Sequence, residues 1–174
     1  MTISMSSASA PILKSMLSNL DYFLVKAQAH AEAKKYDSAN LLAARLAPDM
    51  LPLTRQVLIA CDASKFGISR LAGVEAPKFD DTESTVEQLR ERIAKTITFI
   101  DSVAAEKIDG TEDKDITFPI GRDGSTRTMK GEAYLKHWVI PNMFFHVTTA
   151  YALLRHNGVE LGKTDFLMGA KQAG

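Results

Sequence analysis

The spacing of apolar residues constrains the fold of this chain more than any other feature of its sequence. In residues 142–156 the apolar side chains recur at three- and four-residue steps, and the segments 11–35, 50–71 and 86–103 repeat that spacing. Side chains spaced in this way lie on one face of an α-helix. Four such helices, without a series of strands, favour a single all-α domain over residues 1–174, built as a four-helix bundle.

The third of these helices has the clearest start and the cleanest apolar stripe. Thr82 or Ser84, followed by Glu87 and Gln88, resembles a capping box. Arg92 and its charged neighbours fall on the other side of this helix, and we interpret them as a solvated face. The long connections after the first and third helices leave room for crossovers, so the pattern does not imply simple up-and-down order.

The segment before the last helix follows a different pattern. Residues 116–120 and 125–129 form two short alternating runs with turn residues between them, which predicts a small β-hairpin. Residues 131–138 are again helical in pattern. Pro141 lacks a backbone donor, and we expect it either to kink this segment or to separate it from the last helix.

Composition excludes several classes of function. Basic and acidic residues balance at 21 each, so no global field attracts nucleic acid or an anionic membrane, and neither is an expected partner. No segment is long and apolar enough to span a bilayer. The single cysteine, Cys61, excludes an internal disulfide and, without a secretory signal at the start, predicts a cytoplasmic protein.

Two polar residues in the last helix stand out as candidates for a functional site. Asn142 and His146 are four residues apart, so they project from the same side of a predominantly apolar helix. Buried polar groups need hydrogen-bonding partners. We therefore expect other polar side chains inside the bundle to face this pair.

These residues also carry a resemblance to a known family. The run 141–155, followed by 157–159 and 161–167, resembles the bacterial family catalogued as domain of unknown function nineteen-ninety-three. Residues 46–50, the helix around Gln56 and residues 71–73 fit it too, so the likeness covers nearly the whole chain. That family is similar in fold to the DinB/YfiT-like proteins. These are four-helix bundles, often homodimeric, in which three histidines hold a divalent metal between helices. Some of these relatives are thiol-dependent transferases or isomerases.

The resemblance implies where a metal site would lie in this chain. In the metal-binding relatives one histidine comes from the second helix and two come from the last helix, four residues apart. Matched to that pattern, His146 takes the second paired position, Asn142 the first and Gln56 the position on the second helix. Zinc and nickel prefer imidazole and anionic ligands, whereas amide oxygens are weak neutral donors. The resemblance thus implies a largely degenerate metal site that binds a divalent ion poorly.

Other residues would complete a metal site only if the helices were rotated from this interpretation. Asp49 or Asp62 would then supply an anion, and His137 would enter from the segment before Pro141. His137 and His146 are nine residues apart, which places them on opposite faces of an ideal helix unless the proline breaks the register.

Three hypotheses for function follow. The first is a small-molecule cleft between the helices, in which Tyr151, Trp138 and His137 form a pocket near His146 and the metal triad is largely lost. The second is a zinc- or nickel-dependent, thiol-using transferase or isomerase, with His146 as a ligand and Asn142 or Gln56 positioning a bound water. The third is a homodimeric interaction module. The sequence supports no cofactor beyond this divalent ion.

Overall fold

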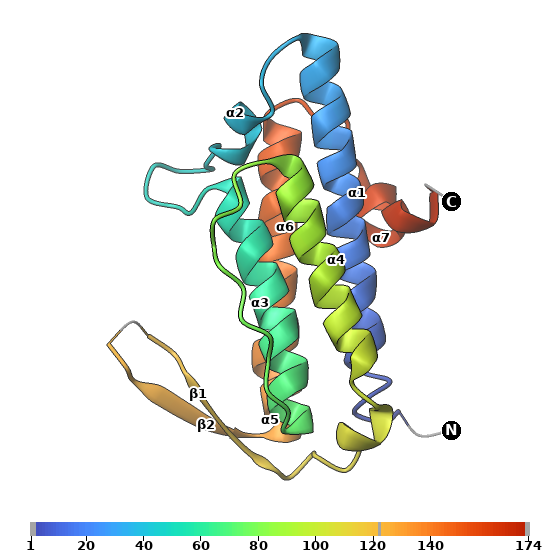
Figure 1. Ribbon diagram of the computed structural model, residues 1–174, viewed down its shortest axis with the longest axis vertical. Coiled ribbons are helices and arrows are strands. Elements are labelled where there is room, and N and C mark those ends of the chain that lie inside the picture. The colour runs from blue at the N-terminus through green and yellow to red at the C-terminus, as the bar shows by residue number, and fades with distance from the viewer. Residues whose placement is uncertain (1–2, 122, 173–174) are drawn as a thin grey trace.

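Four long helices form the body of the protein in a computed structural model that describes residues 3–121 and 123–172 (Figure 1). The helices are α1 (Ala10–Lys34), α3 (Leu53–Ala72), α4 (Val86–Ser102) and α6 (Ile140–His156). They form a closed ring, because α1 packs against α4 and α6, and α3 packs against the same two helices. Their apolar faces meet in one core, as the helical spacing of the sequence predicted.

The chain runs through this bundle in an order that the sequence did not predict. Helix α1 leads to the short helix α2 (Ala39–Leu42), and α3 then returns in the opposite direction. Residues 74–85, which we call the strap, run back along α3, so α4 starts at the same end of the bundle as α3 and points the same way (Figure 1). The lengthwise connection therefore follows the second long helix, not the first or the third, where the sequence left room for a crossover.

Local hydrogen bonding explains where α4 begins. Thr85, not Thr82 or Ser84, is the N-cap: its side chain accepts a hydrogen bond from the backbone N–H of Gln88 at 3.2 Å. The Gln88 side chain accepts one in return from the backbone N–H of Thr85. This reciprocal pair is a capping box, which satisfies two donors that the first turn of a helix leaves free.

The predicted hairpin is present and lies at the end of the bundle. Strand β1 (Asp115–Pro119) pairs antiparallel with β2 (Thr126–Lys130), and the short helix η1 (Ala105–Lys107) precedes them. Ile116 and Phe118 are buried, while the other residues of β1 are exposed. Because Phe118 packs against Tyr134 and Trp138 with ring centroids 4.8 and 4.9 Å apart, the base of the hairpin supports the helical run that follows.

The run from residue 131 to 156 is one continuous helix that changes pitch. It comprises α5 (Gly131–Tyr134), the π-helical segment η2 (Leu135–Val139) and α6. Pro141 neither separates the parts nor ends the helix. A proline inside an α-helix clashes with the carbonyl four residues earlier and lacks the N–H that would bond to it, and the wider turn directly before Pro141 accommodates both effects.

The π turn also aligns a row of side chains. In an α-helix each four-residue step overshoots a full turn by about 40°, so a row at such steps drifts around the helix. A π turn holds more residues and takes back part of this drift. Tyr134, Trp138, Asn142 and His146, which are four residues apart, accordingly stay on the side of the helix that faces α3.

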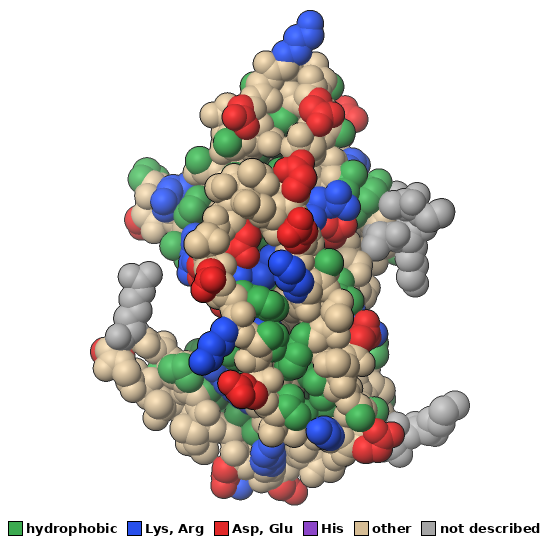
Figure 2. Space-filling view, in the orientation of Figure 1, with side chains coloured by type: hydrophobic (Ala, Val, Ile, Leu, Met, Phe, Trp, Pro, Cys, Tyr) green, Lys and Arg blue, Asp and Glu red, His purple; other side chains and the backbone are tan. Residues whose placement is uncertain are grey.

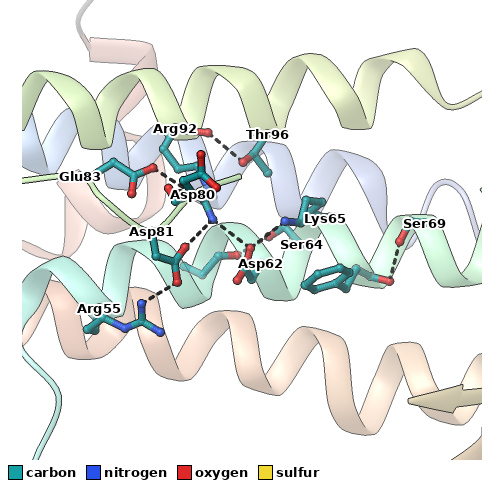
Figure 3. A network of polar contacts seen from close by, with 12 residues as sticks. Arg55, Asp62, Ser64, Lys65, Ser69, Asp80, Asp81, Glu83, Arg92 and Thr96 are labelled. Atoms are coloured by element: carbon teal, nitrogen blue, oxygen red, sulfur yellow. Dashed lines mark hydrogen bonds and ion pairs between the residues drawn. The ribbon is translucent and has the colours of Figure 1, made fainter. Parts of the chain in front are cut away.

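Arg92 ties the strap to the bundle. Only 2% of its side chain is exposed, and its guanidinium pairs with Asp62 on α3 and with Asp81 and Glu83 on the strap at 2.8–3.2 Å (Figure 3). The ring of Phe79 lies 4.5 Å from the same guanidinium. Our interpretation of Arg92 as part of a solvated face was wrong, because the strap covers that flank of α4.

Helix α7 (Lys163–Gln172) packs against α1, on the side of the bundle away from the strap (Figure 1). Phe166 stacks on Phe23, with the ring centroids 6.2 Å apart. Within the described part of the chain, no helix combines the length and the apolar character that a membrane span requires. Acidic and basic side chains are interspersed over the face that carries the strap and α4 (Figure 2).

Candidate functional site

A hydrogen-bonded pair joins α3 to α6 at the position that the resemblance singled out. His146 Nδ1 lies 2.8 Å from Gln56 Oε1, and both side chains are buried. Gln56 Nε2 donates to the carbonyl of Leu51 at 3.0 Å. With its amide nitrogen turned to a carbonyl, Gln56 presents its oxygen to the imidazole, so Nδ1 carries the proton and donates.

Burial keeps this imidazole neutral. Because charging a histidine in an apolar interior costs desolvation energy, the pKa of His146 is lowered from 6.5 to about 4. With its proton on Nδ1, the neutral ring has a free lone pair on Nε2. The pair therefore brings no net charge to the space between α3 and α6.

The residues around His146 do not fit a catalytic divalent metal. Among the residues that the structure describes, no group of three or more His, Cys, Asp and Glu side chains is arranged to hold an ion. The oxygen of Gln56 is already engaged by His146. Asp62 pairs with Lys65 at 3.0 Å and with Arg92 at 3.2 Å. One imidazole without an anionic partner is a poor donor set for zinc or nickel.

A groove lies between the same two helices, about one helical turn from this pair. It encloses ≈ 240 Å³ between α3 and the run from α5 to α6, with Pro119 of β1 at its edge. Phe66 and Trp138 contribute aromatic walls, and Asn142 lies between them and the His146 end. Asn142 is half-buried, and its side-chain amide forms no hydrogen bond with the described part of the chain. The groove therefore offers a free amide beside apolar surface.

The other residues proposed for the pocket lie elsewhere. The Tyr151 hydroxyl donates to the carbonyl of Leu161 at 3.3 Å, and its ring packs edge-on against Phe23 and Phe166. Tyr151 therefore belongs to the contact of α6 with α1 and α7. His137 is exposed and does not line the groove. Of the three predicted pocket residues, the groove contains only Trp138.

Two polar groove residues, Arg70 and Tyr134, were missed by reasoning from the sequence. Arg70 is half-buried near the end of α3, and its Nη1 donates to the hydroxyl of Tyr134 at 3.0 Å. Only a partial signal was present. Tyr134 precedes the predicted pocket residue Trp138 by four, whereas Arg70 follows Phe66, which was not a predicted site residue.

A larger hollow of ≈ 570 Å³ lies between α1 and α4, away from these residues. Its walls include Tyr22, Val25 and Ile97. Its charged lining residues are Asp21, Arg90, Glu87 and Glu91; Arg90 pairs with Asp21 at 2.8 Å and Glu91 with Lys95 at 3.8 Å. The α3/α6 groove is the better candidate site despite its smaller volume, because it lies beside the His146–Gln56 pair and contains the Asn142 amide.

The bundle, its hairpin and the α3/α6 site define a DinB-like helical protein. Residues 5–167 match the family model described as "Domain of unknown function (DUF1993)", and the chain belongs to that family. The chain is similar to a DinB family member protein from Shewanella denitrificans, whose crystal structure it matches with a TM-score of 0.84 and 40% identity over 93% of this chain and 90% of that chain. No curated protein matches. The family assignment from the sequence is confirmed, and the homodimer stays a prediction.

Proposed function

We propose that this protein binds a compact organic molecule in the α3/α6 groove and does so without a catalytic divalent metal. The observation that carries the proposal is the half-buried Asn142 amide, which has no partner within the described chain and stands beside the aromatic walls of Phe66 and Trp138. Apolar walls with a few convergent polar groups are typical of small-molecule sites. The groove, at ≈ 240 Å³, is smaller than the roughly 300–1,000 Å³ usual for drug-sized ligands.

The His146–Gln56 pair has a positioning role in this proposal. Gln56 on α3 and His146 on α6 are hydrogen-bonded to each other, so the pair fixes the two walls relative to one another near one end of the groove. Its neutral state leaves the recognition of charge to other residues. Two of the three positions that the resemblance matches to metal ligands, Gln56 and His146, thus hold the groove together, while the Asn142 amide is free to contact a ligand.

Filling the groove tests the proposal. Ala63 lines it on α3, and Ala63→Phe places a ring in the space. Ala94→Phe is the matched control, because Ala94 lines the larger hollow between α1 and α4. We expect small aromatic fragments, screened by saturation-transfer NMR, to bind wild type and the Ala94→Phe variant but not the Ala63→Phe variant. The proposal would be refuted if the fragments bound the Ala63→Phe variant as well as they bind wild type, or if no fragment bound wild type.

A metal titration separates the proposal from the metal-dependent transferase or isomerase. The protein is incubated with nickel or zinc, desalted and analysed for its elements, beside the His146→Ala variant. We expect neither protein to retain metal in a stoichiometric amount. One ion per chain in wild type that is lost in His146→Ala would overturn the metal-free proposal and favour the enzyme.

A further inference from the structure

Arg70 differs from the other described arginines of α3 and α4 in having no acidic partner. Its guanidinium makes no ion pair with any carboxylate in the described part of the chain, whereas Arg55, Arg90 and Arg92 each pair with an aspartate at 2.7–3.2 Å. Within the part of the chain that the structure describes, its side chain donates one hydrogen bond, to the Tyr134 hydroxyl. A guanidinium carries five N–H donors, so most of its donors are unused within the described chain. Arg70 lies in the last turn of α3, where the helix dipole favours a cation. The dipole uses none of the guanidinium N–H donors.

Its surroundings orient this cation toward the groove. The guanidinium carbon lies 4.8 Å from the ring centroid of Phe66 and 5.7 Å from that of Phe118, so two aromatic rings flank it. Stacking on rings reduces the freedom of the side chain while leaving the edge of the guanidinium free. Arg70 lines the groove together with Phe66, Trp138 and Asn142.

Tyr134 adds a second donor at the same place. Its side chain is 1% exposed, and burial raises the pKa of the phenol, so the hydroxyl keeps its proton. The hydroxyl oxygen accepts from Arg70, and its own proton has no acceptor among the described residues. A buried hydroxyl proton without an acceptor is unfavourable, so an incoming acceptor would be stabilised there.

From these contacts we propose that the groove, if it binds a small molecule as proposed above, selects a compact carboxylate with a flat apolar body. The planar edge of Arg70 and the Tyr134 hydroxyl receive the carboxylate, Phe66 and Trp138 hold the body, and the Asn142 amide contacts its far end. Arginine matches a carboxylate with two parallel donors. The ligand carries a single negative charge, which matches the single charge of Arg70, the guanidinium that lines the groove.

Benzoate and its near-isostere benzamide test the charge of the ligand, and the bulkier phenyl phosphate tests a dianion. The dissociation constants of benzoate, benzamide and phenyl phosphate are measured by ¹H–¹⁵N chemical-shift titration of the full chain in low-salt buffer. Because hydrogen bonds to charged groups are among the stronger ones, we expect wild type to bind benzoate at least about tenfold more tightly than benzamide. Phenyl phosphate, which carries close to two charges at neutral pH, should bind more weakly than benzoate.

Substitutions assign the preference to Arg70. Arg70→Gln should reduce the benzoate preference to within about threefold while leaving benzamide binding unchanged. Arg90→Gln removes an equal charge from the larger hollow between α1 and α4, so this variant should keep the full preference for benzoate over benzamide. Tyr134→Phe keeps the ring and removes the hydroxyl, so it should lower benzoate affinity alone, which gives a second variant if Arg70→Gln does not fold.

The outcomes separate this inference from the proposed function. Equal binding of benzoate and benzamide to wild type would refute the carboxylate assignment and leave the groove as a binding site. A preference that survives both Arg70→Gln and Tyr134→Phe, or tighter binding of phenyl phosphate, would also refute it. If none of the probes binds and the fragment screen also finds no ligand, the proposed function fails and this inference fails with it.

Discussion

Removing the cation at the centre of the strap network should destabilise the protein strongly. Arg92→Met keeps much of the side-chain volume but leaves Asp62, Asp81 and Glu83 without their shared partner. Asp62 retains Lys65 at 3.0 Å, and Asp81 retains Arg55 at 2.7 Å. The main penalty therefore falls on Glu83, whose side chain is 12% exposed and which forms its only ion pair within the described residues with Arg92.

The size of this penalty follows from the burial of the network. Removing one partner of a buried ion pair costs about 3–5 kcal/mol, because the other charge stays desolvated without compensation. For a chain of this length, each kcal/mol lowers the melting temperature by about 2–4 °C, so we expect a decrease of about 6–20 °C. Replacing Glu83 with Gln in the same chain removes the orphaned charge, and the double variant should be more stable than Arg92→Met alone.

Urea unfolding followed by circular dichroism measures these changes in the free energy of unfolding. Arg90→Met is the control, because Arg90 and Asp21 form an exposed pair that is worth no more than about 1 kcal/mol. Our account of the network would be refuted if Arg92→Met and Arg90→Met destabilised the protein equally. It would also fail if Glu83→Gln added to the loss caused by Arg92→Met.

Three further predictions concern single groups in the core. The folded pKa of His146, about 4, lies below its unfolded value of 6.5, so the fold favours the neutral ring. An NMR titration should show a midpoint near 4. The stability that this histidine contributes should fall as the pH drops from 6.5 toward 4. A midpoint near 6.5 would contradict the buried pair. Burial raises the pKa of the Cys61 thiol to about 12, so a thiol reagent should label it only after unfolding, and rapid labelling of the folded chain would be inconsistent with its burial. A Cβ at Gly67 would lie 2.5 Å from Val139 Cγ1, so Gly67→Ala should destabilise the protein by about 1–3 kcal/mol in thermal melts. Adding Val139→Ala to the same chain should recover part of this loss.

Much of the bundle was predictable because each long helix carries its own apolar stripe. The same spacing that gives α4 its stripe places Arg92 three residues after Leu89 and four before Thr96, on the flank of that stripe. Whether such a flank is buried depends on what covers it. The covering strap directly precedes α4, but the pattern of α4 alone does not show that the strap folds back over this flank, so it did not reveal that Arg92 is buried.

The candidate site was predictable only in part, for a related reason. The resemblance paired positions on the second and last helices, and Gln56 and His146 do meet at 2.8 Å. A uniform helical period, however, contains no π turn, and η2 determines which residues before Pro141 join the same row. Tyr134 was therefore not predicted as a site residue, and neither was Arg70, its hydrogen-bonding partner on α3.

The distance along the chain between contacting residues has a consequence for how the groove is assembled. The groups that Arg92 joins lie 9–30 residues before it, whereas Gln56 and His146 are 90 residues apart. Closing the longer loop costs about 1 kcal/mol more in chain entropy. A nascent chain that ends after α4 already holds every member of the strap network but lacks one entire wall of the groove. A ligand that binds between α3 and α6 would therefore stabilise the docking of the last third of the polypeptide.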